Sequence, residues 1–189
     1  YAAFEADMRA GSSDVFEHAM PGGQYTNLRQ QARSLGIENR WPDVVKRYAD
    51  VNRLFGNIVK VTPSSKVVGD MALFMVSHNL TPDDVIDPEK EVAFPDSVVS
   101  FFRGDLGQPV GGVPEKLQAK VLRGEAPLSE RPGASLSPVN FEKIRQELAE
   151  TFGRAPEQVS EQDIAAYVLY PKVFLDFASH RRDFGDTSL

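Results

Sequence analysis

Residues 58–76 place hydroxyl groups and a cation between two apolar segments, and they read IVKVTPSSKVVGDMALFMV. Apolar residues surround Lys60 over the first four positions, which indicates a short extended segment. Beyond Thr62, the apolar residues recur at spacings of three and four, as they do on the buried face of a helix. We therefore predict that Thr62 caps a helix, that Pro63 takes its first position, and that the helix runs to about Ser77.

The first turn of this predicted helix is polar, because Ser64, Ser65 and Lys66 follow Thr62 and the proline. An α-helix leaves N–H groups free in its first turn and carries a partial positive charge there. Together with three hydroxyls and an ammonium, such an end suits a carbonyl oxygen or an anion. For the residue pattern taken alone, an ordinary capped helix is the favoured alternative.

The composition shows no bias towards polyanionic partners. With 189 residues, the chain can form one large core or two small ones. A net charge of −6 and the absence of a basic run argue against nucleic acid or an anionic membrane as a partner. The absence of cysteine excludes disulfides and thiolate chemistry. No apolar run reaches the roughly 18 residues of a membrane span and the first residues lack a signal-peptide layout, so we expect a cytoplasmic protein.

Helical periodicity recurs along the chain, whereas no segment shows repeated strand periodicity. Residues 1–20 predict a short helix, a turn and an irregular segment, and MPGG at residues 20–23 predicts a turn. Apolar spacing, capping residues and prolines predict the other helices, which cover residues 24–35, 41–55, 81–86, 98–102, 115–122, 138–152 and 160–170, with a last one from Pro171. We therefore expect a mainly α-helical fold.

Residues 124–138 are rich in proline and glycine, which indicates an extended linker and a subdomain boundary. We therefore divide the chain into a helical segment, residues 1–126, and a second part, residues 127–189, which consists of the linker and the C-terminal helices.

No constellation in the sequence indicates a self-contained metal or catalytic site. The three histidines, His18, His78 and His180, are far apart and share no short ligand motif. The acidic run 83–91 lacks the ligand spacing of a calcium loop, and the glycine-rich run 104–114 lacks the ending of a phosphate loop. The residue patterns alone thus indicate a mainly helical, acidic domain with no metal site of its own.

Five motifs follow one another along the chain: EHAMPGGQYTNL (17–28), VKVTPSSKVVGDMA (59–72), FPDSVV (94–99), GDLGQP (104–109) and YVLYPKVF (167–174). In sequence and in order, they closely resemble the carboxyltransferase region of pyruvate carboxylase. The resemblance covers essentially the whole chain, so both predicted parts resemble one carboxyltransferase region.

Related biotin enzymes share part of this pattern in their conserved carboxylase domain. The oxaloacetate decarboxylase α subunit and the transcarboxylase that uses oxaloacetate have similar Pro-Gly-Gly and Thr-Pro elements. Residues 24–25 and 64–66 resemble the pyruvate carboxylase form of the motifs.

The resemblance implies an ATP- and biotin-dependent ligase that moves CO2 from carboxybiotin to pyruvate and yields oxaloacetate. In that family the divalent metal and pyruvate lie in a (β/α)8 barrel, whose metal ligands are absent from this chain. The chain resembles the helical funnel that follows and caps the barrel. The implied partners are therefore the barrel part and the biotin carrier domain, with the biotin carried on another domain and the metal held outside this chain.

The resemblance also assigns residue roles by matching positions. Thr62 is the proton-relay threonine, and Gln24, Ser65 and Lys66 lie beside the biotin ring. A threonine hydroxyl is too weak an acid or base to ionise at neutral pH, but it can pass on a proton if a stronger base takes one as it accepts another. Ser65 and Lys66 can donate to the ureido oxygen as negative charge builds on it.

We therefore expect a fragment of a carboxyltransferase that carries part of the active site and has no turnover alone. Two alternatives stay open: a non-catalytic interaction module with the same fold, and a decarboxylase- or transcarboxylase-type relative. The presence of Thr62, Ser65 and Lys66 argues against the first. An ATP-dependent biotin carboxylase region in the parent gene would argue against the second.

Overall fold

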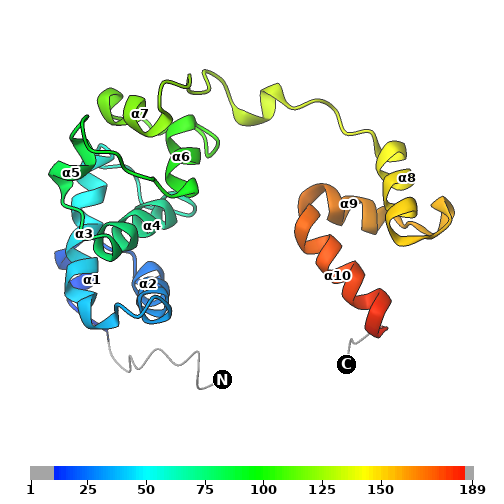
Figure 1. Cartoon of the computed structure of the whole chain (residues 1–189), viewed down its shortest axis with the longest axis horizontal. Coiled ribbons are helices and arrows are strands. Elements are labelled where there is room, and N and C mark those ends of the chain that lie inside the picture. Colours follow the sequence, from blue (N-terminus) through cyan, green and yellow to red (C-terminus); the bar gives the residue numbers. More distant parts are fainter. Residues whose placement is uncertain (1–10, 186–189) are drawn as a thin grey trace. The chain divides into compact units, whose positions relative to one another are not determined.

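The computed structural model describes residues 11–185, and every regular element in this range is a helix (Figure 1). The α-helices are α1 (Asp14–Glu17), α2 (Gly22–Ser34), α3 (Trp41–Leu54), α4 (Ser64–Ser77), α5 (Pro82–Ile86), α6 (Asp96–Arg103), α7 (Glu115–Leu122), α8 (Phe141–Phe152), α9 (Glu161–Leu169) and α10 (Pro171–Phe184). Short 3-10 helices are η2 (Glu38–Arg40), η3 (Pro132–Ser135) and η4 (Pro156–Gln158). The predicted mainly α-helical fold is confirmed.

The contacts within the chain divide it into two compact units, Tyr1–Ser135 (unit 1) and Leu136–Leu189 (unit 2). The border lies within the proline- and glycine-rich residues 124–138. Residues just after position 126 still contact unit 1. The Leu128 N–H donates to the Arg103 carbonyl at 2.8 Å, and the Leu128 carbonyl accepts from the Gln108 amide at 2.7 Å.

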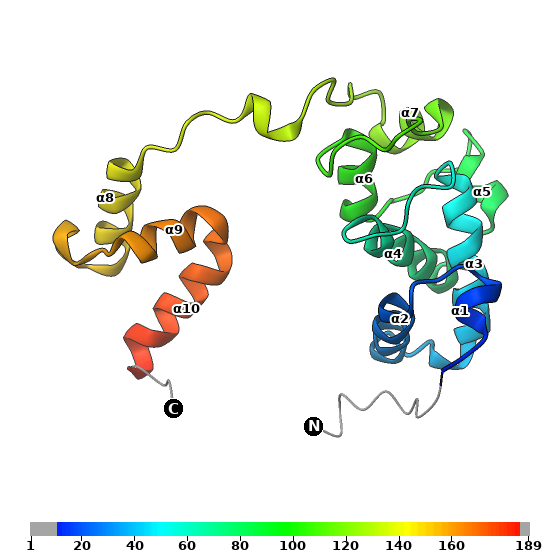
Figure 2. The same cartoon turned by 180° about the vertical axis from the view of Figure 1, so that it is seen from behind.

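Helix α4 is the centre of unit 1 and is buried on most sides. Helices α2, α3 and α6 all pack against it, and α3 and α6 lie beside it in both views (Figures 1 and 2). Its buried apolar residues are Val67, Val68, Met71, Ala72, Leu73, Met75 and Val76. The sequence predicted one buried face. The buried surface is wider than that because three helices, and not one, cover α4.

The cap predictions for α5 and α9 are confirmed. Thr81 and Ser160 each accept a hydrogen bond from a backbone N–H three residues later and form a capping box. In the first box, the pKa of Asp84 lies below its usual range, chiefly because the Lys90 ammonium donates to its carboxylate and Thr81 donates as well.

The prediction of a turn at residues 20–23 is wrong, because Gly22 and Gly23 form the first turn of α2. The Tyr25 N–H donates to the Pro21 carbonyl at 2.9 Å, which starts the helical hydrogen bonds two residues earlier than the apolar pattern indicated. Helix α1 lies within the segment predicted to be irregular. The short helix predicted before it falls mainly on residues 1–10, which lie outside the described residues.

Helix α8 begins at Phe141 and not at Pro138. The reason is the Asn140 side chain, which accepts a hydrogen bond from the Lys143 N–H at 2.9 Å and so caps the helix. Asparagine is among the best N-cap residues, so it takes precedence over the earlier proline.

Unit 2 has a core of its own among α8, α9 and α10 (Figure 1). Its buried residues are Leu148, Ala149, Val159, Ile164, Phe174 and Ala178. The Phe174 ring meets the rings of Phe152 and Tyr167 edge to face, at centroid distances of 6.4 and 6.1 Å. This is a favourable arrangement for aromatic rings, and it joins all three helices.

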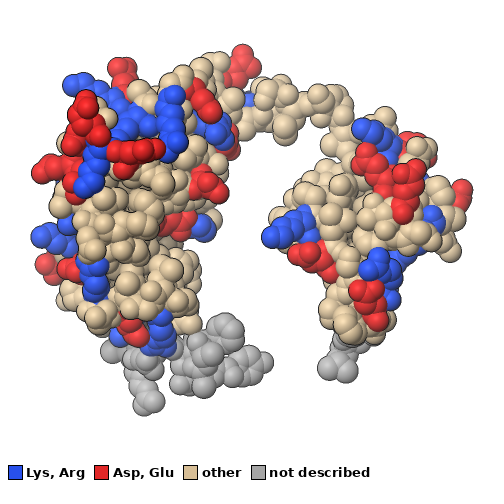
Figure 3. Space-filling view, viewed as in Figure 1, with Lys and Arg blue, Asp and Glu red and all other residues tan. Residues whose placement is uncertain are grey.

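Acidic and basic side chains are interspersed over the part of unit 1 that carries α5 and α7 (Figure 3). Lys120 of α7 donates to the carbonyls of Asp84, Val85 and Asp87 at 3.2, 2.8 and 2.6 Å. A lysine at a helix C-terminus satisfies carbonyls that the helix leaves free. The Lys120 ammonium therefore joins α7 to the end of α5.

Gly69 allows α2 to approach α4 closely. A Cβ atom at Gly69 would lie 2.6 Å from Nε2 of Gln24 and 2.8 Å from Cδ2 of Leu28. The Gln24 amide is the end of a flexible side chain and can move, but Leu28 is fully buried in the core. The missing side chain at Gly69 thus allows the close helix spacing and leaves room for the Gln24 amide beside α4.

We expect Gly69→Ala to be less stable than the control Gly23→Ala by roughly 1–3 kcal/mol, the usual cost of overpacking a core. Both changes gain helix propensity, but a Cβ at Gly23 meets no atom within 4 Å. Urea unfolding of the two variants measures the difference. Equal stabilities would contradict a close contact between α2 and α4.

Candidate functional site

The structure places Thr62 on an exposed segment before α4, with a role different from the predicted cap. Pro63, and not Thr62, occupies the N-cap position, and no side chain caps the helix. The amide of Ser65 donates to the Val61 carbonyl at 3.1 Å, and that of Lys66 to the Pro63 carbonyl at 3.0 Å. These backbone carbonyls accept from the first-turn amides that a Thr62 side-chain cap would otherwise bind. Within residues 11–185, the Thr62 hydroxyl has no hydrogen-bond partner.

The sequence analysis expected free backbone N–H groups at the start of α4, and this expectation is wrong for Ser65, Lys66 and Val67. The amide of Val67 donates to the Pro63 carbonyl at 3.3 Å, so Ser65, Lys66 and Val67 all have backbone partners. A ligand at this end of α4 therefore meets side-chain donors, and these three amides are not available to it.

The Ser64 side chain fixes residues 59–61, the segment just before Thr62, by hydrogen bonds to their backbone. Its hydroxyl oxygen lies 2.5 and 2.6 Å from the carbonyl oxygens of Val59 and Val61, and it accepts from the Val61 N–H at 3.1 Å. Since a hydroxyl has a single proton, it donates to one carbonyl at a time. The sequence placed Ser64 among the polar first-turn residues without a role, but the structure shows that it folds the preceding loop back onto the helix.

Gln24 and Ser65 lie on the side where α2 and α4 meet. The Gln24 amide lies next to Gly69, as its close approach to a Cβ at that position shows. Residues four apart share a helix face, so Ser65 lies on the Gly69 side one turn earlier. Ser65 is buried, with 7% of its surface exposed. The structure therefore brings these two predicted site residues to the same helix contact.

Lys66 lies on an exposed part of the first turn and is held by an ion pair. Its ammonium donates to Oδ2 of Asp70 at 2.5 Å, and the Ser97 hydroxyl donates to the same oxygen at 2.6 Å. The sequence analysis assigned neither Asp70 nor Ser97. The spacing of four between Lys66 and Asp70 was a signal for the pair, but nothing local connects Ser97 to it.

An apolar groove lies beside the Thr62 segment. It lies between the chain before α4 and the loop after α6, and its lining includes residues 57–59, Val61, 63–64 and 106–110. Val59 and Val61 are 77% and 62% exposed. Exposed apolar side chains in this number mark a surface suited to a ligand or to another part of a protein.

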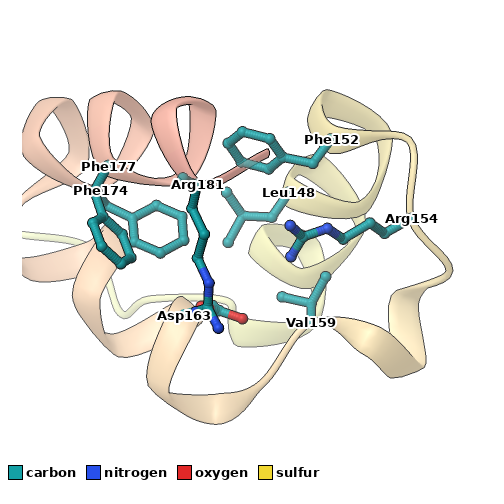
Figure 4. Close-up of a pocket in the computed structure, with 9 residues that line it drawn as sticks. Leu148, Phe152, Arg154, Val159, Asp163, Phe174, Phe177 and Arg181 are labelled. Carbon is teal, nitrogen blue, oxygen red and sulfur yellow. The ribbon is translucent and has the colours of Figure 1, made fainter. Parts of the chain in front are cut away.

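Unit 2 also contains a pocket, and none of the predicted site residues Gln24, Thr62, Ser65 and Lys66 lines either this pocket or the groove of unit 1. Leu148, Val159 and the aromatic rings of Phe152 and Phe174 form the walls of the pocket in unit 2, and Arg154 and Arg181 lie at it (Figure 4). The Arg154 guanidinium lies 5.8 Å from the centre of the Phe152 ring, within cation–π range.

The part of the chain that the structure describes contains neither a metal-binding cluster nor a membrane-spanning helix. Between residues 11 and 185, no group of three or more His, Asp or Glu side chains could hold a metal ion. In the same range, no helix combines the length and the apolar character needed to cross a membrane.

Comparison with known proteins connects this geometry to a family. A family model described as "Conserved carboxylase domain" matches residues 15–189. Pyruvate carboxylase of Bacillus subtilis (strain 168) is 51% identical over 189 residues, which are 100% of this chain and 16% of the relative. Pyruvate carboxylase of Staphylococcus aureus is 52% identical with the same coverage.

Solved structures show the same fold. The carboxyl transferase domain from Rhizobium etli pyruvate carboxylase with pyruvate and biocytin has a TM-score of 0.89 and 54% sequence identity, and the match covers 98% of this chain and 31% of that chain. A complete multifunctional pyruvate carboxylase from the same organism has a TM-score of 0.88 at the same identity, with 18% of that chain covered.

The chain spans about 16% of the length of the curated relatives that it matches. It is similar to them along its whole length, and the resemblance inferred from its motifs is confirmed. The chain therefore belongs to the conserved carboxylase domain family, and it corresponds to a helical part of the carboxyltransferase domain of pyruvate carboxylase.

Proposed function

We propose that this chain contributes part of the biotin pocket and the proton-relay residue Thr62 to a carboxyltransferase that moves CO2 from carboxybiotin to pyruvate. The observation that carries the proposal is the exposed Thr62 hydroxyl, which has no partner within residues 11–185. Its chain neighbours Val61 and Pro63 line an apolar groove. Support also comes from the 54% identical Rhizobium etli carboxyl transferase domain, which has been solved with pyruvate and biocytin.

The donors around the start of α4 fit a biotin ureido group. Ser65 and Lys66 can each donate to a ureido oxygen, and the Gln24 amide can donate or accept nearby. When bound, biotin supplies the carboxyl group and then a ureido nitrogen that can take up a proton. The positive charge of the Lys66 ammonium stabilises the ureido oxygen most strongly when negative charge builds on that oxygen. An oxyanion site lowers a reaction barrier in the same way.

Thr62 acts on the proton that must leave the pyruvate methyl group. Its oxygen accepts that proton while its own proton passes to the basic nitrogen, so the hydroxyl is neutral before and after transfer. The carbanion equivalent left on pyruvate then captures CO2, and oxaloacetate results. Free rotation of an unpaired hydroxyl suits this exchange, because no existing hydrogen bond has to break first.

The divalent metal and the pyruvate site belong to other parts of the enzyme in this proposal. The barrel part and the biotin carrier domain are the partners, and the apolar groove faces one of them. The relatives named above are pyruvate carboxylases, which favours this reaction over that of a decarboxylase-type relative. The retained Thr62, Ser65 and Lys66 favour it over a non-catalytic module.

In the full-length enzyme that contains this chain, we expect Thr62→Ala to lower pyruvate carboxylation by about 10²- to 10⁴-fold, as loss of a proton-transfer group does. Thr62→Ser keeps the hydroxyl and should retain more activity. ATP-dependent biotin carboxylation, assayed separately, should not change. Thermal unfolding should not change either, because the Thr62 hydroxyl has no partner within the described residues.

Thr151→Ala is the matched control for this substitution. Its hydroxyl is exposed and donates to the Glu147 carbonyl at 2.7 Å within α8. The control should carboxylate pyruvate at the wild-type rate. A folded Thr62→Ala enzyme with the same rate as this control would show that Thr62 relays no proton.

For the 189-residue chain alone, we expect no pyruvate-dependent formation of oxaloacetate and no tightly bound metal. The physical reason is that the proposed site needs a metal and a pyruvate pocket that other parts of the enzyme provide. Elemental analysis and a coupled assay on the purified chain check both points. A stoichiometric zinc or manganese ion that resists chelators would contradict the expectation.

A further inference from the structure

The Asp70 carboxylate connects Lys66 to a helix that contains none of the proposed site residues. Oδ2 of Asp70 accepts from the Lys66 ammonium at 2.5 Å and from the Ser97 hydroxyl at 2.6 Å. Lys66 and Asp70 lie one turn apart on α4, whereas Ser97 comes from the first turn of α6. The Lys66 side chain is 60% exposed, but that of Asp70 is only 18% exposed.

These contacts orient the Lys66 side chain more than they stabilise the fold. An exposed ion pair between residues four apart contributes little to folding, because water screens it and both side chains lose freedom. Asp70 differs from a surface partner because a second helix donates to the same oxygen. The Ser97 hydroxyl thereby fixes the carboxylate, and the fixed carboxylate limits the positions that the long Lys66 side chain can take.

We propose that Asp70, held by Ser97, is a positioning residue that keeps the Lys66 ammonium at the first turn of α4, where it donates to the ureido oxygen. This rests on the role proposed above for Lys66. An ammonium has three N–H donors, so one bond to Asp70 leaves two for a ligand. Without the carboxylate, the side chain is free to extend into water, away from the site.

The test is a double-mutant cycle in the full-length enzyme. Lys66→Met, Asp70→Asn and the double variant are compared by kcat and KM for pyruvate carboxylation, and by ATP-dependent biotin carboxylation. Asp70→Asn keeps the shape of the side chain and removes its charge. We expect it to lower carboxyl transfer by up to about a hundredfold, the loss seen when a reacting group is displaced. In the Lys66→Met background it should cause no further loss, because residues that act through one another are not additive.

Ser97→Ala is the second variant. Because it removes only one hydroxyl, it still tests the inference if Asp70→Asn fails to fold. It should lower carboxyl transfer less than Asp70→Asn and, like it, have no effect in the Lys66→Met background. The matched controls are Ser100→Ala on the same helix and Asp176→Asn, an exposed carboxylate on α10. Neither control should change carboxyl transfer, and biotin carboxylation should be constant throughout.

The possible outcomes separate this inference from the proposed function. If Lys66→Met has wild-type carboxyl transfer, Lys66 has no role in the site, and both this inference and the role proposed for Lys66 are overturned, whereas the Thr62 relay is tested separately by Thr62→Ala. If Lys66→Met is impaired but Asp70→Asn and Ser97→Ala are not, the proposed function stands and the positioning role is overturned. If the losses of Asp70→Asn and Lys66→Met multiply in the double variant, Asp70 acts independently of Lys66, and the inference is again wrong.

Discussion

Burial of the apolar surface of α4 is the interaction on which the rest of unit 1 depends. Burial of a valine, leucine or methionine side chain contributes about 1.5–3 kcal/mol, and α4 buries several of them against α2, α3 and α6. The exposed ion pairs of the unit contribute roughly 0.2–1 kcal/mol each, so they cannot determine the packing. They decide instead how individual side chains are directed once the helices are in place.

The same burial explains why the candidate site is at the beginning of α4. The apolar residues hold the body of the helix in the core, so Thr62 and Lys66 at its beginning are exposed, whereas Ser65 is buried. Gly69 lets α2 come close enough to bring Gln24 to this end, and the Ser64 hydroxyl folds the Thr62 segment back onto it. The contact between α2 and α4 thereby places the Gln24 amide beside Gly69, although the two residues are far apart in the sequence.

The exposure of this end also fits a site that is shared with the rest of the enzyme. Thr62 is exposed and adjoins apolar side chains that would be costly to leave in water. In the proposed reaction, a surface from another part of the enzyme covers them and excludes water, which strengthens each donor at the start of α4.

Sequence patterns were enough to predict the helical fold class, a helix that ends at about Ser77, the caps at Thr81 and Ser160 and, through the motifs, the family. These predictions depend on local periodicity, on capping within a few residues or on direct comparison of residues. The patterns did not predict the start of that helix, which is Ser64 and not Pro63. Nor did they determine that Thr62 leaves its hydroxyl unpaired, because an alternative backbone path in which Pro63 takes the cap position satisfies the first amides equally well. Only the tertiary structure decided that α4 is covered on three sides and that Ser97 meets Asp70. Both follow from the packing of helices that are distant in the sequence, and no local pattern encodes which of them will touch.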